Sequence, residues 1–152
     1  MENNQNLSVR ISRDFAVPVD RLYTAWTTET DLRAWWQPMG NTLHHLTNDL
    51  KEGGSLQYEF HTKEGELAFK IEGVYREVAP NKKLVYTWNW KVPNDTIQDS
   101  EFLLTIKFHG QGSESTLQVQ QENFVNEEAV LPHQQGWEKA LEDLQSYLSN
   151  GR

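Results

Sequence analysis

The sequence predicts an α+β fold in which a curved antiparallel sheet packs against one long helix near the C-terminal end. Three observations support this prediction: short alternating runs of apolar and polar residues, an early segment with helical periodicity, and a last segment whose apolar residues repeat every three to four positions. Such a helix has to bury its apolar stripe, and the apolar face of the sheet is the only surface large enough to cover it.

The N-terminal part predicts one strand followed by two short helices. Apolar and polar residues alternate over residues 7–15, which is typical of a strand with one face turned inward. Pro18 suits the first turn of a helix because its φ is fixed, and an apolar stripe at helical spacing follows it: Val19, Leu22, Tyr23 and Trp26. Residues 28–31 resemble a capping box for a second short helix, which Pro38 and Gly40 end.

The middle of the sequence predicts an antiparallel meander of short strands joined by turns. Alternation marks strands at residues 56–60, 67–71, 84–90, 102–108 and 117–121. Turn-forming residues separate them at residues 51–54, 62–65, 79–82 and 110–112, and residues 91–99 form a longer loop. Gly73 indicates either a β-bulge or a place where another segment packs close to the backbone. The predicted order is one strand, two short helices, six strands and a long helix, although alternation locates only five of these six strands.

The last segment predicts a long amphipathic helix. Its apolar stripe consists of Val130, His133, Trp137, Leu141, Leu144 and Leu148. Asn126 is the predicted N-cap, and the two Glu at residues 127–128 suit the positive end of the helix dipole. Pro132 would remove one backbone hydrogen bond inside such a helix, so we expect either a kink at this residue or a helix that starts near it.

Composition narrows the functional classes. The 152 residues include 14 Lys and Arg against 22 Asp and Glu, and the net charge of −8 argues against binding to nucleic acid or to anionic membrane surfaces. The sequence has no Cys, which excludes disulfides, a thiolate nucleophile and Cys-bound metals. No apolar run approaches the length of a membrane-spanning helix, so we expect no membrane insertion and a cytoplasmic location. We predict a single domain at residues 7–149 after a disordered tail at residues 1–6.

Six short motifs occur in a fixed order along the chain. They are Phe-Ala-Val-Pro-Val at residues 15–19, Leu-Arg-Ala-Trp-Trp-Gln-Pro at 32–38, Glu-Gly-Gly at 52–54, Gly-Val-Tyr-Arg-Glu-Val-Ala-Pro at 73–80, Leu-Val-Tyr-Thr-Trp at 84–88 and Gln-Gly-Trp at 135–137. Together, from about Leu7 to Leu148, they resemble the START-like (SRPBCC) proteins. The most similar subgroup is the one named after the activator of the heat-shock protein 90 ATPase. Pro132 departs from the family pattern.

The resemblance implies a helix-grip fold. In this fold a curved seven-stranded antiparallel sheet wraps around the long C-terminal helix, and two small helices after the first strand close one end of a cavity. It also implies that the cavity binds hydrophobic ligands such as lipids, sterols or polyketide-like molecules, although a minority of family members are enzymes.

Aromatic residues are the main candidates for a binding site. The sequence has six Trp, six Phe and five Tyr, and alternation puts many of these rings on the inner face of the sheet. The rings either fill a solid core or wall a cavity, since large rigid rings pack poorly into a concave volume. The helix-grip resemblance favours the cavity. The predicted ligand-binding residues are Trp35, Trp36, Tyr58, Phe60, Phe69, Tyr86, Trp88, Trp90, Phe124, His133, Trp137 and Leu141.

Polar residues give weaker candidates. His133 lies on the apolar stripe of the last helix, where it would contact a ligand carbonyl or hydroxyl, unless it is a hydrogen-bonded core or surface histidine. His44 and His45 cannot bind one metal ion from a regular strand, because neighbouring side chains point to opposite faces. Glu59 and His61 fall on the polar register of their strand, which is typical of a solvated surface. We therefore predict no catalytic residue, no metal site and no cofactor.

Three functions remain open on the sequence. The first is an intracellular binding module that holds a small hydrophobic molecule between the sheet and the C-terminal helix. The second is a co-chaperone-like interaction domain that stimulates a heat-shock ATPase, which only the subgroup resemblance supports. The third is a cyclase-, hydratase- or isomerase-type enzyme that uses His133 in the same cavity. We favour the binding module, with a small hydrophobic ligand as its partner and a monomeric or weakly dimeric state; the ligand itself is not identified.

Overall fold

The computed structural model describes residues 8–91, 101–124 and 127–150. The chain starts with strand β1 (Val9–Phe15), helices α1 (Val19–Thr27) and α2 (Glu29–Trp35), and the 3-10 turn η1 (Pro38–Gly40). The strands that follow in the described residues are β2 (Thr42–Asn48), β3 (Ser55–His61), β4 (Leu67–Ala79), β5 (Lys83–Lys91), β6 (Glu101–Gln111) and β7 (Glu114–Glu122). A second 3-10 turn, η2 (Glu127–Ala129), leads into the long helix α3 (Val130–Asn150).

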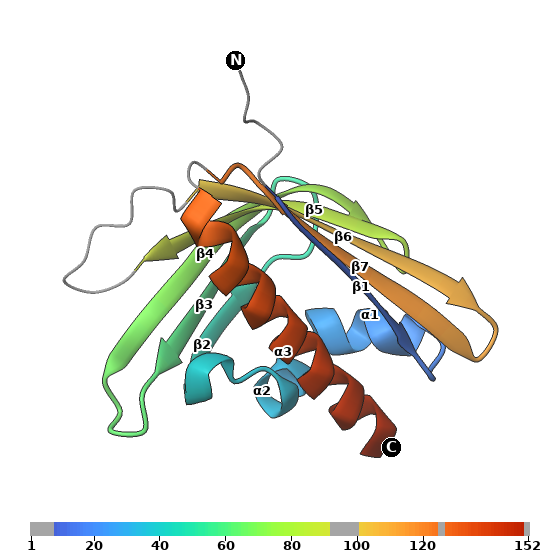
Figure 1. Ribbon diagram of the computed structural model, residues 1–152, viewed down its shortest axis with the longest axis horizontal. Helices are drawn as coiled ribbons and strands as arrows, with labels where there is room; N and C mark the ends of the chain where they lie inside the picture. Colours follow the sequence, from blue (N-terminus) through green and yellow to red (C-terminus); the bar gives the residue numbers. More distant parts are fainter. Residues whose placement is uncertain (1–7, 92–100, 125–126, 151–152) are drawn as a thin grey trace.

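The described strands form one seven-stranded antiparallel sheet in the order β1-β7-β6-β5-β4-β3-β2. Every pair of neighbours is consecutive in the chain except β1 and β7, which bring the first and last strands side by side. The sheet curves around α3, and α1 and α2 lie on the same side of it as α3 (Figure 1). This arrangement confirms the predicted α+β class and the helix-grip fold. None of the helices in the described part of the chain has both the length and the apolar character that a membrane crossing requires.

Most predicted strands and turns are confirmed, and the differences have local causes. Alternation assigned no residues to β2, because only Leu43 is fully buried in this strand and a bulge between Leu43 and His45 breaks its ladder with β3. Gly73 is not at a bulge. A Cβ atom at this position would lie 1.9 Å from the backbone oxygen of Thr87, so the alternative of a close backbone approach is correct.

The start of α3 accommodates Pro132. The helix begins at Val130, so Pro132 lies in its first turn, where backbone N–H groups lack a helical partner in any case. Of the two alternatives, the helix that starts near Pro132 is therefore the correct one. The predicted N-cap Asn126, the tail at residues 1–6 and the loop after Lys91 lie outside the described residues.

The core lies between α3 and the concave face of the sheet. Trp137, Leu141, Leu144 and Leu148 form the buried stripe of α3, as predicted. Inward-facing strand residues complete the core, among them Tyr58, Phe60, Phe69, Ile71, Tyr86, Trp88, Leu104, Ile106, Leu117 and Val119. Burial of one leucine side chain contributes roughly 1.5–3 kcal/mol to folding, so the stripe determines which side of α3 faces the sheet.

A polar network joins α3 to the two short helices. Asp31 in α2 is only 9% exposed and accepts hydrogen bonds from Arg21 in α1, at 3.1 and 3.2 Å, and from the Tyr147 hydroxyl in α3. Burial alone would raise the pKa of Asp31, but the hydrogen bonds from Arg21 and Tyr147 and the charge of Arg21 outweigh burial and lower the pKa.

The predicted capping box at the start of α2 is wrong, since Thr28 at the N-cap makes no capping hydrogen bond with its side chain.

The Asp31→Asn variant tests this network. Because the pKa of Asp31 is lower in the folded protein than in the unfolded chain, its carboxylate stabilises the fold above about pH 4, and the contribution is lost as the pH falls through the folded-state value. We expect the variant to lose about 1–3 kcal/mol of unfolding free energy near pH 7, and progressively less below about pH 4. Urea denaturation across this pH range measures the loss.

The matched control for this variant is Glu29→Gln. It removes the exposed ion pair between Glu29 and Arg33, which should cost less than about 0.5 kcal/mol. A loss for Asp31→Asn that stays constant as the pH is lowered would contradict the proposed charge state of Asp31.

A second prediction concerns the close approach at Gly73. The added methyl group of Gly73→Ala meets the backbone oxygen of Thr87, and Thr87 pairs with Leu103 in the β5–β6 ladder, so the oxygen cannot move without disturbing that ladder. We expect a loss of about 2–4 kcal/mol of unfolding free energy. Gly136→Ala is the control: its methyl group would meet nothing within 4 Å, and alanine in a helix should gain about 0.5–1 kcal/mol. Equal effects of the two substitutions in thermal denaturation would reject this explanation.

Candidate ligand-binding site

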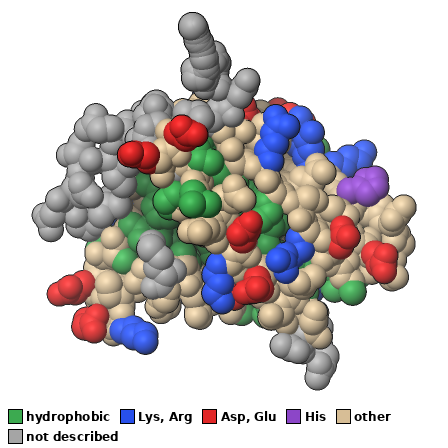
Figure 2. All heavy atoms as spheres, viewed as in Figure 1, with side chains coloured by type: hydrophobic (Ala, Val, Ile, Leu, Met, Phe, Trp, Pro, Cys, Tyr) green, Lys and Arg blue, Asp and Glu red, His purple; other side chains and the backbone are tan. Residues whose placement is uncertain are grey.

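A pocket of about 430 Å³ lies between the N-terminal half of α3, the turn η1 and strand β5. Its lining consists of Trp36, Gln37, Pro38, Gly40, Trp88, Trp90, Gln121, Pro132, His133, Gly136, Trp137, Lys139, Ala140 and Asp143. Figure 2 shows hydrophobic side chains gathered on the surface beside the N-terminal half of α3. The volume falls in the range of pockets that hold small organic molecules.

Small residues of α3 keep this pocket open. Gly136 and Ala140 are one helical turn apart and both line the space. A Cβ atom at Gly136 would meet nothing within 4 Å, so this stretch of the helix faces empty space. Farther along the same stripe, Leu141 and Leu144 are completely buried and fill the volume under the helix. The change from small to large residues along α3 therefore confines the pocket to one end.

A chain of polar groups crosses the wall of the pocket. Gln121 is completely buried on β7, and its Oε1 accepts a hydrogen bond of 2.7 Å from the indole Nε1 of Trp137. An indole N–H can only donate, which fixes the orientation of the amide and directs its Nε2 toward Nδ1 of His133, at 3.3 Å. Nδ1 is then the acceptor, and the neutral His133 ring carries its hydrogen on Nε2. A side chain predicted to face the cavity is thus held in one tautomer.

Trp90 adds an unused hydrogen-bond donor to the same wall. Its ring packs against Phe69, with centroids 4.7 Å apart, and edge-on against His133 at 6.0 Å. The indole Nε1 is buried and has no hydrogen-bond acceptor among the described residues. A buried donor without a partner costs about 1–3 kcal/mol, and an acceptor in the adjacent pocket would remove this cost.

Charged groups of the lining belong to the exposed side of α3. Lys139 Nζ donates to Asp143 Oδ1 at 2.9 Å, one helical turn away. The hydrogen bond and the charge of Asp143 raise the pKa of Lys139, so the ammonium group stays charged at neutral pH. The pocket therefore has an apolar, indole-walled interior and a paired, hydrated rim.

The structure divides the predicted ligand-binding residues into two groups. Trp36, Trp88, Trp90, His133 and Trp137 come together in the lining of the pocket. Trp35, Tyr58 and Tyr86 instead surround a gap of only about 10 Å³, too small for a ligand. Phe60, Phe69, Phe124 and Leu141 are buried outside the lining. The aromatic rings thus form a solid core in the middle of the sheet and wall an open space at one end of it.

Several lining residues were not among the predicted ones. Gln121 shares the inward register of β7 with Leu117 and Val119, so a glutamine on an apolar strand face was the available signal. Gly136 and Ala140 could have been recognised as small residues one turn apart on a helix that is otherwise lined with large ones. Pro38 and its neighbours in η1 reach the pocket only through tertiary packing, which no local pattern reveals.

Solved structures share the fold of this chain. The AHSA1 protein of Silicibacter pomeroyi is 24% identical with a TM-score of 0.79, and the alignment covers 93% of this chain and 97% of that one. A protein of Rhodobacter sphaeroides is 18% identical with a TM-score of 0.81, covering 99% and 97%. DynU16, from the dynemicin biosynthetic locus, is 20% identical with a TM-score of 0.78. The alignment covers 97% of this chain but only 49% of DynU16.

Sequence comparison identifies the family. Among functionally curated proteins, none matches the sequence significantly. The sequence model of the family described as activator of Hsp90 ATPase homolog 1-like protein, in contrast, matches residues 16–149, which run from before α1 to the penultimate residue of α3. The chain therefore belongs to the activator of Hsp90 ATPase homolog 1-like family, within the START-like (SRPBCC) superfamily.

Proposed function

We propose that this protein binds a small hydrophobic molecule that carries a hydrogen-bond acceptor, in the pocket between η1, β5 and α3. The observation that carries the proposal is the open volume of about 430 Å³ walled by the indoles of Trp36, Trp88, Trp90 and Trp137. Removing this much apolar wall from water favours an apolar guest. Lipid-, sterol- and polyketide-like molecules belong to this chemical class.

The acceptor is inferred from the polar groups of the wall. The amide of Gln121 is used by Trp137 and His133, whereas the Nε1 donor of Trp90 has no partner among the described residues. A ligand carbonyl or hydroxyl oxygen beside Trp90 would satisfy this donor. A polar contact of this kind orients a guest that apolar packing alone would leave free to rotate.

The size of the pocket sets the expected affinity. A ligand of about 20 non-hydrogen atoms at roughly −0.3 kcal/mol per atom gains about −6 kcal/mol, which corresponds to a Kd in the tens of micromolar. Binding of this strength suits a protein that senses or carries a metabolite rather than one that retains it permanently.

The polar groups of the lining favour binding over catalysis. Its titratable side chains are His133, Lys139 and Asp143, and the last two are paired with each other on the exposed side of α3. Proton transfer to and from a substrate needs an acid or base placed against the reacting atoms. Gln121 and Trp90 hold the His133 ring in the wall by a hydrogen bond and an edge-on ring contact, which suits a residue that orients a bound molecule. The cytoplasmic location and the monomeric or weakly dimeric state stay predictions.

A substitution that fills the pocket tests the proposal. In Gly136→Phe the Cβ atom meets nothing within 4 Å and the residue is exposed, so the protein should fold, while the new ring competes with a ligand for the pocket and should weaken binding by more than about tenfold. Titrations with naringenin and laurate, followed by tryptophan fluorescence, measure the affinity. The matched control is Gln135→Phe, at an exposed neighbouring residue of α3 outside this pocket. Unchanged binding to Gly136→Phe, or no binding of either probe to the unmodified protein, would reject the proposed site.

The role of the Trp90 donor is tested separately. Trp90→Phe keeps an aromatic ring and removes the N–H group, so it should weaken naringenin binding by about three- to tenfold. Naphthalene, which has no oxygen acceptor, should bind to both proteins with equal affinity. An equal loss for both probes would show that the ring, and not its donor, is what the ligand contacts.

A further inference from the structure

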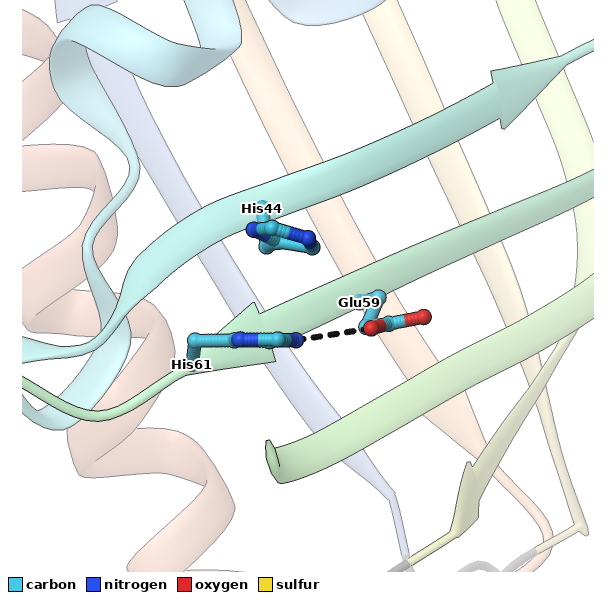
Figure 3. A group of neighbouring side chains, drawn as sticks. All are labelled: His44, Glu59 and His61. Carbon is cyan, nitrogen blue, oxygen red and sulfur yellow. Dashed lines mark hydrogen bonds and ion pairs between the residues drawn. The ribbon is translucent and has the colours of Figure 1, made fainter. Parts of the chain in front are cut away.

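Three metal-ligating side chains meet on the outer face of the sheet, away from the pocket. Glu59 and His61 are two residues apart on β3 and therefore share one face, while the intervening Phe60 points into the core. Nε2 of His61 lies 2.7 Å from Oε2 of Glu59. Figure 3 shows this pair with His44 from the neighbouring strand β2 above it.

A β-bulge brings His44 to this pair. Leu43 pairs with Phe60 and His45 pairs with Glu59, so His44 is the extra residue between two consecutive partners. Its side chain is exposed, and its ring stacks on that of His61 with centroids 3.8 Å apart and an interplanar angle of 17°. The expectation that neighbouring histidines point to opposite faces assumed a regular strand, and the bulge removes this condition.

The surroundings of His61 match those of a metal-bound histidine. Its Nδ1 lies 3.2 Å from the backbone oxygen of Gly65, and because a carbonyl oxygen only accepts, Nδ1 carries the hydrogen. In the neutral ring, the lone pair of Nε2 then faces the carboxylate of Glu59, an arrangement that requires a cation or a proton between the two atoms. Metal-bound histidines typically donate their other N–H to a backbone carbonyl or a carboxylate in this way.

We propose that His44, Glu59 and His61 form a binding site for a divalent transition metal ion, with Zn²⁺ as the best match. Their ligand atoms lie within 4.8 Å of one another. Metal–ligand bonds of about 2.0–2.2 Å in a tetrahedral site place such atoms about 3.4 Å apart. Nε2 of His61 and Oε2 of Glu59, now 2.7 Å apart, would separate slightly around the ion, and the stacked ring of His44 would turn toward it. His44 can supply this movement because it is exposed, and a water molecule would complete the coordination.

Neighbouring charges decide which ions fit. Lys70 on β4 pairs directly with Glu59 across the strands. Its positive charge weakens the binding of cations that rely on electrostatic attraction to the carboxylate. Ca²⁺ and Mg²⁺ prefer several oxygen ligands, and the cluster has a single carboxylate. Imidazole nitrogens instead suit Zn²⁺, Cu²⁺ or Ni²⁺. The site should therefore select transition metal ions over the hard divalent cations.

Calorimetric titration of the untagged protein with zinc chloride at neutral pH tests the proposal. We expect one zinc ion per chain, and no heat of binding with calcium or magnesium chloride. His44→Ala, His61→Ala and Glu59→Gln should each weaken the zinc affinity by at least about tenfold. Loss of a residue that only supports a ligand already costs about tenfold or more, and loss of a ligand should cost no less. His109→Ala is the matched control, since this exposed histidine lies on β6, four strands from β2 in the sheet, and should leave zinc binding unchanged.

Nuclear magnetic resonance of the unmodified protein gives a readout that needs no variant. On zinc addition the imidazole ¹⁵N signals of His44 and His61 should shift, while those of His109 and His133 should stay in place. The proposal is overturned by a protein that binds no zinc at millimolar concentration, by equal shifts at all histidines, or by folded His44→Ala and His61→Ala variants that bind as the unmodified protein does. Because the cluster lies on the face opposite the pocket, none of these results bears on hydrophobic ligand binding.

Discussion

The packing of α3 against the concave face of the sheet is the contact on which the rest of the structure depends. Leu141 and Leu144 are completely buried in it, and they set the distance between helix and strands. The hydrogen bonds of Asp31 then attach α1 and α2 to the far half of this helix through Tyr147. With the C-terminal half of α3 fixed in this way, the size of the side chains under its N-terminal half determines how closely that half packs on the sheet.

The pocket follows from this geometry and from residue size. In the middle of the sheet, Trp36 fits between Tyr58, Phe60 and Trp88 at ring distances of 5.1–5.9 Å, and the rings exclude any guest. Toward the N-terminal end of α3, Gly136 and Ala140 replace large side chains, and the packing stays open. One set of aromatic residues thus serves both purposes: it fills the core in one place and walls a cavity in another.

The sequence predicted the fold well because periodicity is a local signal. Alternation in β3 and β5 placed Tyr58, Tyr86 and Trp88 inward, and helical spacing identified the buried face of α3. The sequence placed the cavity between the sheet and the C-terminal helix, but not the end of the sheet at which it lies, because that depends on how side chains from η1, β5, β7 and α3 meet. The His44 cluster was missed for a related reason: a bulge moves one residue out of register, and strand alternation does not report bulges.

The central claim, that the end of the pocket near Trp90 receives a ligand, is tested most directly by the indole N–H signals of the six tryptophans. Two-dimensional ¹H–¹⁵N spectra recorded during titration with naringenin, laurate and progesterone would follow each of them. We predict that at least one probe shifts the Trp90 signal most and the Trp35 signal least, since the Trp35 indole donates to Ala25 inside the packed core. Spectra in which no probe moves the Trp90 signal, or in which Trp35 shifts as much as Trp90, would contradict the account.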